Sequence, residues 1–495
     1  MKKIALSSLF ITLFSLSVLA DKIVLLDNPK DSLQARADYI QIAQESIRAQ
    51  YFTVENDETS KTALALLLEA TRKNPNLKVK ILIDSMHNLL LNKTMAAVMG
   101  NISAEPTNIE IREYNQFNLF RFTRYTKRMH DKALIIDGKH LISGGRNIAN
   151  GYNGAAGNKK GDKALPVFED SDALLLESPA INEATRYFDD LWNSKFVNKV
   201  QLYDYDKEEL AADYCSSFQA RHEDTFQCES SRQYRVKRVR KELDYLNTLA
   251  NSYKENQLRV KHEIKDWAAK AIEVDNVTYL FDEVRGQKSN LKKPANNIGV
   301  QLYKAISKAN NSVVIVTPYT VVTPEQEALF KHLQAKNVEV ILITNSKGSN
   351  DVPAAHVGYE KTRQKAIDAG VKIYEYQGPD TLHAKMVLID RTTLFIGSFN
   401  WDFRSQNLNR EVGILAELPQ DKESNLSINV VRKFSKILKK SCPLGGEVCN
   451  LALRTESVED LTDQELEDLV AAFKLRQNKT GALYRILYPL IEKQL

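Results

Sequence analysis

The feature that most constrains the fold of this chain is a motif that occurs twice. A histidine, a lysine two residues later and an aspartate five residues after that begin at His130, and the same pattern begins at His383. Each copy lies on an aliphatic run, and each is followed at the same offset by an asparagine, Asn147 or Asn400. Two copies with matching offsets indicate an internal duplication, so we expect two fused halves in one chain.

The repeat extends beyond the motif. Each half begins with a strand, a helix and a second aliphatic strand, at 46–51, 64–70 and 79–84 and again at 312–319, 325–333 and 338–344. Strands that alternate with helices predict the α/β class, with parallel sheets covered by helices. The length of 495 residues also exceeds the usual limit of a single hydrophobic core. We therefore expect two pseudo-symmetric halves that face each other around a shared site.

The segment between the halves has a different composition. Residues 234–272 contain no Gly or Pro and carry apolar side chains at helical intervals among many charges. This predicts either a helical insertion packed on the sheets with a solvated face, or a basic helical lid near an anionic surface. We divide the chain into a signal peptide (1–20), an N-terminal half (21–195), a mainly helical insertion (196–290), a C-terminal half (291–425) and a helical tail (426–495).

The first twenty residues have the pattern of a secretory signal peptide. Lys2 and Lys3 give a positive start, residues 4–18 are mostly apolar, and Ala20 provides a small residue for cleavage. We therefore expect an exported protein, periplasmic or secreted, with only peripheral membrane contact.

The four cysteines fit an oxidising compartment. They form two close pairs in the sequence, and neither pair has the spacing of a zinc site. Four cysteines allow three connectivities, and the short separations favour local pairing, which links Cys215 to Cys228 and Cys442 to Cys449.

The motif residues suit the chemistry of a phosphate ester. A histidine and a lysine two residues apart on a strand point to the same face. Lysine and asparagine side chains from both halves can neutralise a phosphate without a metal, and small residues let the backbone approach the ligand. The residues predicted to bind the substrate are Asn147, Asn400, Gly145 and Ser398.

The two histidines can divide the reaction between them. One imidazole attacks phosphorus, and the other protonates the leaving alcohol and then activates the acceptor, which is water or an alcohol. We expect no metal and no cofactor. The residues predicted to be catalytic are His130, Lys132, Asp137, His383, Lys385 and Asp390.

These residues resemble the signature of the phospholipase D superfamily. The run from Gly397 to Glu411 is similar to the second-motif segment of bacterial cardiolipin synthases, especially the C type, as is the stretch from Thr344 to Arg363. The resemblance implies a duplicated α-β-α sandwich, with His130 as the nucleophile and His383 as the general acid and base. Trp401, Phe403 and Arg410 depart from the family pattern.

A catalytic imidazole needs an acceptor for its second nitrogen, and each half offers a carboxylate after its asparagine. If the halves face each other, the carboxylate of one half reaches the histidine of the other, as the resemblance also implies. We predict that Glu411 contacts His130 and that Asp170 contacts His383, with Glu169 and Asp172 as alternates for Asp170. Asp137 and Asp390, seven residues after each histidine at the end of the strand, would anchor the site without touching the substrate.

Another candidate patch precedes the first motif. Arg121, Arg124 and Arg128 share one predicted helix face beside aromatic side chains. They are either solvated or touch anionic lipid headgroups at the mouth of the site.

The leading functional hypothesis is phosphatidyl transfer between phospholipids at a membrane surface. Its alternatives are hydrolysis of phospholipids to phosphatidic acid, cleavage of nucleic acid, and a binding scaffold without activity. The net charge of +5 is modest for a protein that grips a nucleic-acid backbone, and two complete motifs disfavour a scaffold. We infer no obligate protein partner and expect a monomer.

Overall fold

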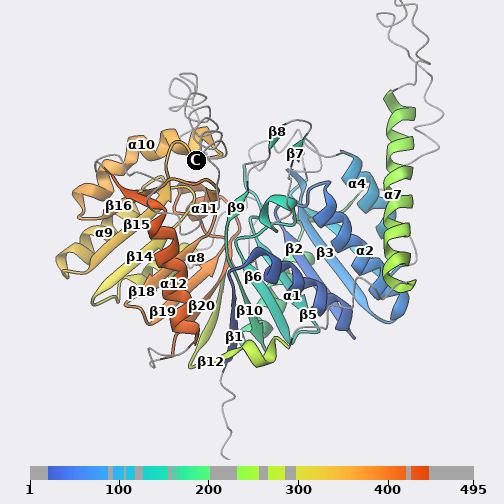
Figure 1. The fold of residues 1–495 in the computed structure, drawn as a ribbon, viewed down its shortest axis with the longest axis horizontal. Coiled ribbons are helices and arrows are strands. Elements are labelled where there is room, and N and C mark those ends of the chain that lie inside the picture. Colours follow the sequence, from blue (N-terminus) through green and yellow to red (C-terminus); the bar gives the residue numbers. More distant parts are fainter. Residues whose placement is uncertain are drawn as a thin grey trace, which may run out of the picture.

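The computed structural model describes residues 21–86, 93–104, 107–116, 126–153, 159–160, 163–164, 167–200, 231–255, 266–284, 297–419 and 425–444. Figure 1 shows two large sheets side by side, each with helices on its outer face. A core of buried side chains from both halves fills the space between the sheets. The predicted α/β class and the two pseudo-symmetric halves are confirmed.

The first sheet is mixed. Its strands β2 (Ser46–Tyr51), β3 (Lys78–Asp84) and β4 (Ile109–Tyr114) are parallel, whereas the strand after the first histidine, β5 (Lys132–Ile136), runs antiparallel to β2. The remaining strands of this sheet are β6 (His140–Gly144), β10 (Asp172–Leu176), β1 (Asp21–Leu26), β11 (Val197–Lys199) and β12 (Ile272–Val274), and the order is β11-β4-β3-β2-β5-β6-β10-β1-β12.

The second sheet repeats this order. It contains β13 (Val277–Phe281), β14 (Ser312–Val316), β15 (Glu339–Asn345), β16 (Lys372–Tyr376), β18 (Met386–Ile389), β19 (Thr393–Gly397), β20 (Val412–Glu417) and β21 (Ser441–Pro443). Its order, β13-β20-β19-β18-β14-β15-β16-β21, matches β1-β10-β6-β5-β2-β3-β4-β11 of the first sheet, in which β12 is an additional edge strand.

The prediction of parallel sheets holds for only part of each sheet. In both halves, only the three strands that alternate with helices are parallel to one another. The strand after each histidine is joined to its successor by a short turn, and strands joined in this way must be antiparallel.

Helices cover the outer face of each sheet. The first sheet carries α1 (Pro29–Ile42), α2 (Glu58–Lys73), α4 (Lys93–Ala104) and α7 (Ser231–Glu255), and the second carries α8 (Ile298–Ile306), α9 (Pro324–Ala335) and α10 (Pro353–Asp368). Between the sheets, α5 (Ala180–Trp192) and α12 (Asn425–Lys439) add their apolar sides to the shared core. The amphipathic pattern of both helices accounts for their burial there.

Two of the predicted domain boundaries need correction. The segment 196–290 holds α7, which packs on α2 and α4, but it also holds strands of both sheets. Because β13 pairs with β20, the C-terminal half begins before residue 291. The tail from residue 426 is not wholly helical, since β21 follows α12 and pairs with β16.

Several predictions fall outside the described residues. These include the signal peptide, Arg121, Arg124 and three of the four cysteines. Only Cys442 is described, so the local pairing of the cysteines stays a prediction. Arg128 is described, and it is not at a surface: it is buried and ion-paired with Asp84.

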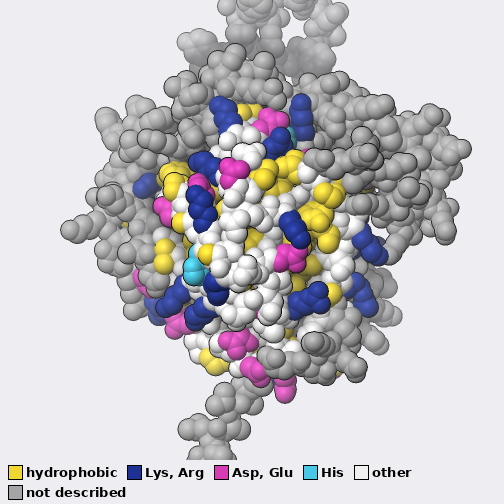
Figure 2. Space-filling model, turned by 90° about the vertical axis from the view of Figure 1, so that its left-hand side faces the viewer, with side chains coloured by type: hydrophobic (Ala, Val, Ile, Leu, Met, Phe, Trp, Pro, Cys, Tyr) yellow, Lys and Arg dark blue, Asp and Glu magenta, His cyan; other side chains and the backbone are white. Residues whose placement is uncertain are grey.

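Figure 2 shows the side of the molecule formed by the C-terminal half, where Lys and Arg side chains are interspersed with Asp and Glu. Val352, which caps α10, and Ile367 within α10 have exposed apolar side chains, and single exposed apolar residues are normal on protein surfaces. Within the described part of the chain, no helix is both long enough and apolar enough to span a bilayer.

Candidate active site

The two histidines lie at the ends of the strands rather than within them. β5 begins at Lys132 and β18 begins at Met386, so each histidine precedes its strand in extended backbone. The lysine ammonium bends back to the carbonyl of its own histidine, with Lys132 Nζ 2.5 Å from His130 O. Lys385 makes the equivalent contact with His383. Each histidine and its lysine therefore form one local unit, as the spacing predicted.

Backbone pairing between the halves brings these units together. The amide of His130 donates to Arg410 O at 2.9 Å, and the amide of His383 donates to Glu169 O at 2.8 Å. Strand β9 (Phe168–Glu169) also pairs with β17 (Thr381–Leu382) across the halves. Each acceptor directly precedes a candidate carboxylate, so the backbone fixes where Asp170 and Glu411 lie.

The crossed contacts between carboxylates and histidines are confirmed. Glu411 Oε2 lies 3.0 Å from His130 Nδ1, and Asp170 Oδ2 lies 2.6 Å from His383 Nδ1. Both carboxylates are fully buried. The carboxylates engage Nδ1, so Nε2 is the nitrogen of each ring that is available for chemistry, and Nε2 of His383 lies 3.1 Å from Lys385 Nζ.

Serine hydroxyls hold Glu411 in place. Ser405 Oγ donates to Oε1 at 2.7 Å, and Ser398 Oγ donates to Oε2. The prediction that Ser398 binds substrate is therefore corrected, because its hydroxyl faces Glu411 and its carbonyl lies 3.0 Å from His130 Nδ1.

Gly145 has the equivalent position in the first half. A β-carbon built there would lie 2.1 Å from Asp170 Oδ1. The close neighbour that requires glycine is thus the carboxylate of Asp170, and the predicted role of Gly145 in approaching the ligand is also corrected.

Asp137 and Asp390 do not take part in the site. Both lie beyond the opposite end of their strands, in left-handed backbone at φ 53° and 50°. The Asp137 carboxylate accepts the amides of residues 44–46, and the Asp390 carboxylate accepts those of residues 310–312. They anchor the start of β2 and β14, so their assignment as catalytic residues or as supports of the histidines was wrong.

Asn147 and Asn400 are buried where the predicted site requires them. Asn147 accepts the amide of Thr53 at 3.3 Å. Asn400 Oδ1 is buried with no hydrogen-bond partner among the described residues. A buried acceptor without a donor is costly, so a ligand hydroxyl that donates to Asn400 Oδ1 would be favoured, whereas a phosphate could be bound only by the Asn400 amide nitrogen.

Burial and charge set the protonation of the site. Burial lowers the pKa of His130 to about 4, helped by Lys132 and opposed by Glu411. Burial and Lys385 lower the pKa of His383 to about 3 against the opposing effect of Asp170. Both rings are therefore neutral at pH 7 when no anion is bound.

The lysines and Asp170 complete the charge balance. Burial, with repulsion from Lys385, lowers the pKa of Lys132 to about 7, and burial lowers that of Lys385 to about 8. Burial alone would raise the pKa of Asp170, but His383 and Lys385 outweigh it and hold it well below its ordinary value. Lys132 also affects His383, and Lys385 affects His130, so the two half-sites form one electrostatic unit.

Sequence reasoning missed the aromatic side chains that surround the histidines. Tyr152 Oη lies 3.4 Å from His383 Nε2, and the Tyr152 ring stacks on Phe168 with centroids 4.3 Å apart. Phe52 meets the His130 ring edge-on at 5.1 Å. Phe52 directly follows β2, Tyr152 ends a short 3-10 helix and Phe168 begins β9, so all three lie outside the motif and its spacing did not indicate them.

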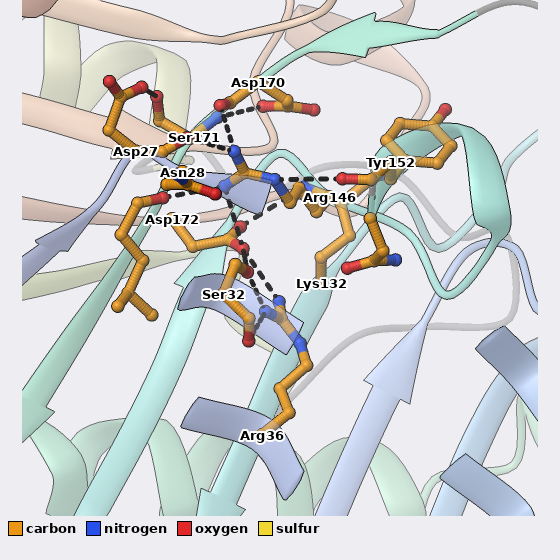
Figure 3. Close-up of polar contacts among 12 residues, drawn as sticks. Asp27, Asn28, Ser32, Arg36, Lys132, Arg146, Tyr152, Asp170, Ser171 and Asp172 are labelled. Carbon is orange, nitrogen blue, oxygen red and sulfur yellow. Dashed lines mark hydrogen bonds and ion pairs between the residues drawn. The ribbon is translucent and has the colours of Figure 1, made fainter. Parts of the chain in front are cut away.

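A buried ion network behind Asp170 was also missed. Figure 3 shows Arg36 and Arg146 approaching Asp172 from opposite sides. Their guanidinium nitrogens lie 3.0 and 3.3 Å from Asp172 Oδ2, and Arg146 also donates to the carbonyl of Asp170. The network fixes the backbone that presents Asp170 to His383, which is why Asp172 is not available as the alternate ligand.

With this geometry established, the comparison with protein families is decisive. The family described as "Cardiolipin synthase, PLD-like domain" matches residues 37–192 and 302–438, together more than half of the chain. The chain belongs to this family. It is therefore an enzyme of the phospholipase D superfamily, and the resemblance inferred from the motifs is confirmed.

Individual relatives agree with the family assignment. The chain is 26% identical over 419 residues to cardiolipin synthase C of Escherichia coli (strain K12), across 79% of this chain and 80% of that protein. It is also 26% identical over 427 residues to an uncharacterised protein of Helicobacter pylori (strain ATCC 700392 / 26695), across 80% of this chain and 76% of that protein.

A solved structure confirms the duplicated sandwich. Phosphatidylserine synthase of Haemophilus influenzae Rd KW20 superposes with a TM-score of 0.61, covering 96% of this chain and 98% of that chain at 17% identity. At this identity the likeness establishes the shared fold alone.

This family site can stabilise a phosphate and move a proton. Two ammonium groups and two asparagines can bind a phosphodiester, while each Nε2 can act as a nucleophile or as an acid. Within the described ranges, no three His, Cys, Asp or Glu side chains are grouped to hold a metal ion. Independence from metals remains a prediction.

Proposed function

We propose that this enzyme transfers a phosphatidyl group between phospholipids through a phosphohistidine, with cardiolipin or a related lipid as the product. The observation that carries the proposal is the crossed pair of histidines, each with its Nδ1 on the carboxylate of the other half. The name of the curated relative, cardiolipin synthase C, supports the choice of phospholipids as substrates.

In the first step, His130 Nε2 attacks phosphorus and the bond to the leaving oxygen breaks. His383 Nε2 gives its proton to that oxygen, and Lys132 and Lys385 offset the charge on the phosphoryl oxygens. The arriving phosphate adds a negative charge beside Lys132 and Lys385 and favours the charged form of both lysines. The negative charge of the phosphate raises the pKa of the neighbouring His383, which allows it to become the acid.

In the second step, His383 takes a proton from the acceptor, whose oxygen attacks the phosphohistidine and releases His130. An alcohol acceptor gives a new phospholipid, and water gives phosphatidic acid. Both outcomes use the same residues, so access of the acceptor decides between transferase and hydrolase.

Product analysis distinguishes the two outcomes. Purified protein is incubated with mixed phospholipid vesicles, with and without glycerol, and the lipids are identified by mass spectrometry. Cardiolipin or another transfer product supports the proposal, whereas phosphatidic acid alone identifies a hydrolase. His130→Ala and His383→Ala, singly, should each abolish turnover without unfolding the protein, because nucleophile and acid act as one unit. Substantial residual activity in either variant would contradict a single shared site.

We further propose that the protein is exported, acts on a membrane by peripheral contact, and works as a monomer with two disulfides. The signal-like first twenty residues and the paired cysteines support this. Thiol titration of the denatured exported protein should find no free cysteine. Peptide mapping that links Cys228 to Cys442 would contradict local pairing.

A further inference from the structure

A cavity of about 580 Å³ lies between α1 and α2 and reaches the outer face of the first sheet. Figure 1 shows the two helices next to one another on this face. The cavity lining is largely aliphatic and includes Leu33, Ala37, Ile40, Ala63, Leu66 and Leu67. Its volume falls within the range of about 300–1,000 Å³ that is typical of sites for small ligands.

The second half fills the corresponding space with an aromatic side chain. Ile148 follows Asn147, bridges to Val54 and lines the cavity. Trp401 follows Asn400 and makes the equivalent bridge to Thr320.

The Trp401 ring is almost completely buried between the helices that correspond to α1 and α2. Its centroid lies 5.3 Å from that of Tyr303 on α8 and 5.9 Å from that of Phe330 on α9. The same structural position is therefore plugged in one half and left open in the other.

One end of the cavity lies next to the active site. Ile148 is adjacent to Asn147, and Tyr51, which also lines the cavity, pairs with Lys132 across β2 and β5. The start of α2 is joined to the loop after Asn147, since Thr59 Oγ1 donates to Asn150 Oδ1 at 2.8 Å. From this end, the lining extends along α1 from Lys30 to Gln41, a rise of about 16 Å.

We propose that this cavity takes one acyl chain of the phospholipid whose phosphate lies at His130 and His383. The assignment rests on the proposed function and adds a subsite to it. A mostly apolar cavity whose lining starts beside the phosphate-binding residues and follows α1 suits an alkyl chain better than a polar ligand. Only the first half provides this space, so the subsite also gives the pseudo-symmetric site one preferred direction for the bound lipid.

Filling the cavity tests the proposal. Ile148→Trp copies the natural plug of the second half, and Ala63→Phe fills the cavity from α2 without touching a motif residue. Ala328→Phe, at an exposed position of α9, is the matched control. The assay measures kcat and KM with phosphatidylglycerols of increasing chain length in mixed micelles. Thermal melting shows that the variants fold.

For the wild type and the control, KM should fall up to about fourfold for each methylene that enters the cavity, until it is full. Both filled variants should lose this dependence on chain length while keeping kcat on dihexanoyl phosphatidylglycerol. A phosphatidylglycerol with a photoreactive group at the chain end should label residues 30–41 or 59–67 in the wild type but not in the filled variants.

The proposed acyl-chain subsite would be wrong if the filled variants kept the dependence of KM on chain length, or if the photoreactive phospholipid labelled residues outside 30–41 and 59–67. Labelling of these helices by a photoreactive free fatty acid but not by the phospholipid would overturn it too, as would an apolar segment of this chain found in the cavity. Failure of the proposed function has a different signature, because the wild type would then turn over no phospholipid, whether or not the helices are labelled.

Discussion

Replacing Asp170 with Asn tests how the two halves share the chemistry. The change keeps the shape of the side chain and removes the negative charge of the carboxylate. Asp170 Oδ2 lies 2.6 Å from His383 Nδ1. Asp170 is fully buried and the histidine side chain is only 5% exposed, so solvent screens this interaction little. The missing charge should destabilise every state in which His383 carries a second proton.

The geometry sets the size of the effect. At an effective dielectric constant of about 20, two unit charges at the separation of 2.6 Å attract each other by about 6 kcal/mol. Asparagine can still accept the Nδ1 hydrogen bond, so we expect a loss of about 3 to 6 kcal/mol. Since about 1.4 kcal/mol corresponds to a factor of ten, the protonation step should slow by about a hundredfold to ten-thousandfold.

Two substrates separate proton donation from other effects. One substrate is phosphatidylglycerol, whose leaving alcohol needs a proton. The other is phosphatidyl-p-nitrophenol, whose leaving group departs readily as the p-nitrophenolate anion. In single-turnover experiments, Asp170→Asn should show the full loss with phosphatidylglycerol and less than about a tenfold loss in the p-nitrophenol burst. The matched control is Asp189→Asn, which removes a carboxylate from a partly exposed ion pair with Arg48 outside the site.

Two results would refute this reasoning. A phosphatidylglycerol rate within about tenfold of the wild type would mean that Asp170 does not stabilise the charged ring. An equal loss with both substrates would mean that the substitution disturbs the site in general and that His383 is not the acid.

Four further predictions concern the site and the aspartate that lies outside it. Glu411→Gln should slow the p-nitrophenol burst as strongly as the lipid reaction, by about a hundredfold or more, because Glu411 supports the nucleophile; a normal burst would contradict this. The lowered pKa values of Lys132 and Lys385 mean that both ammonium charges are lost as pH rises through about 7 to 8, so sulfate should bind more weakly at about pH 9 than at about pH 6. Calorimetric titration measures this, and constant affinity would show that the lysines do not hold the anion. Asp390→Asn should reduce the free energy of unfolding by about 1 to 3 kcal/mol in denaturant titrations with little change in kcat, whereas a large loss of kcat in folded protein would return this residue to the site. EDTA should leave activity unchanged, and a rate restored by one particular divalent ion would disprove a metal-free mechanism.

The sequence determined the parts of this protein in which chemistry is encoded locally and repeated. The spacing of histidine and lysine produces the same local unit in both halves, with the ammonium folded back onto the histidine carbonyl. The repeat also predicted strands β2 and β3 closely, because both carry apolar side chains that are buried in the first half. The crossed pairing of Asp170 and Glu411 followed from the duplication, since a two-fold arrangement places each carboxylate opposite the other half.

Only the tertiary structure decided which residues each position of the repeated motif contacts. Asp137 and Asp390 belong to the motif by spacing, yet the length of the strand carries them away from the histidines to backbone amides at the opposite end. Gly145 packs against Asp170 and Ser398 donates to Glu411, and each of these carboxylates lies just before the neighbouring strand of the same sheet, β10 or β20. The network of Arg36 and Arg146, and the cavity that Trp401 fills in one half only, likewise depend on contacts between distant segments. Such contacts are set by packing between elements, and sequence spacing does not report them.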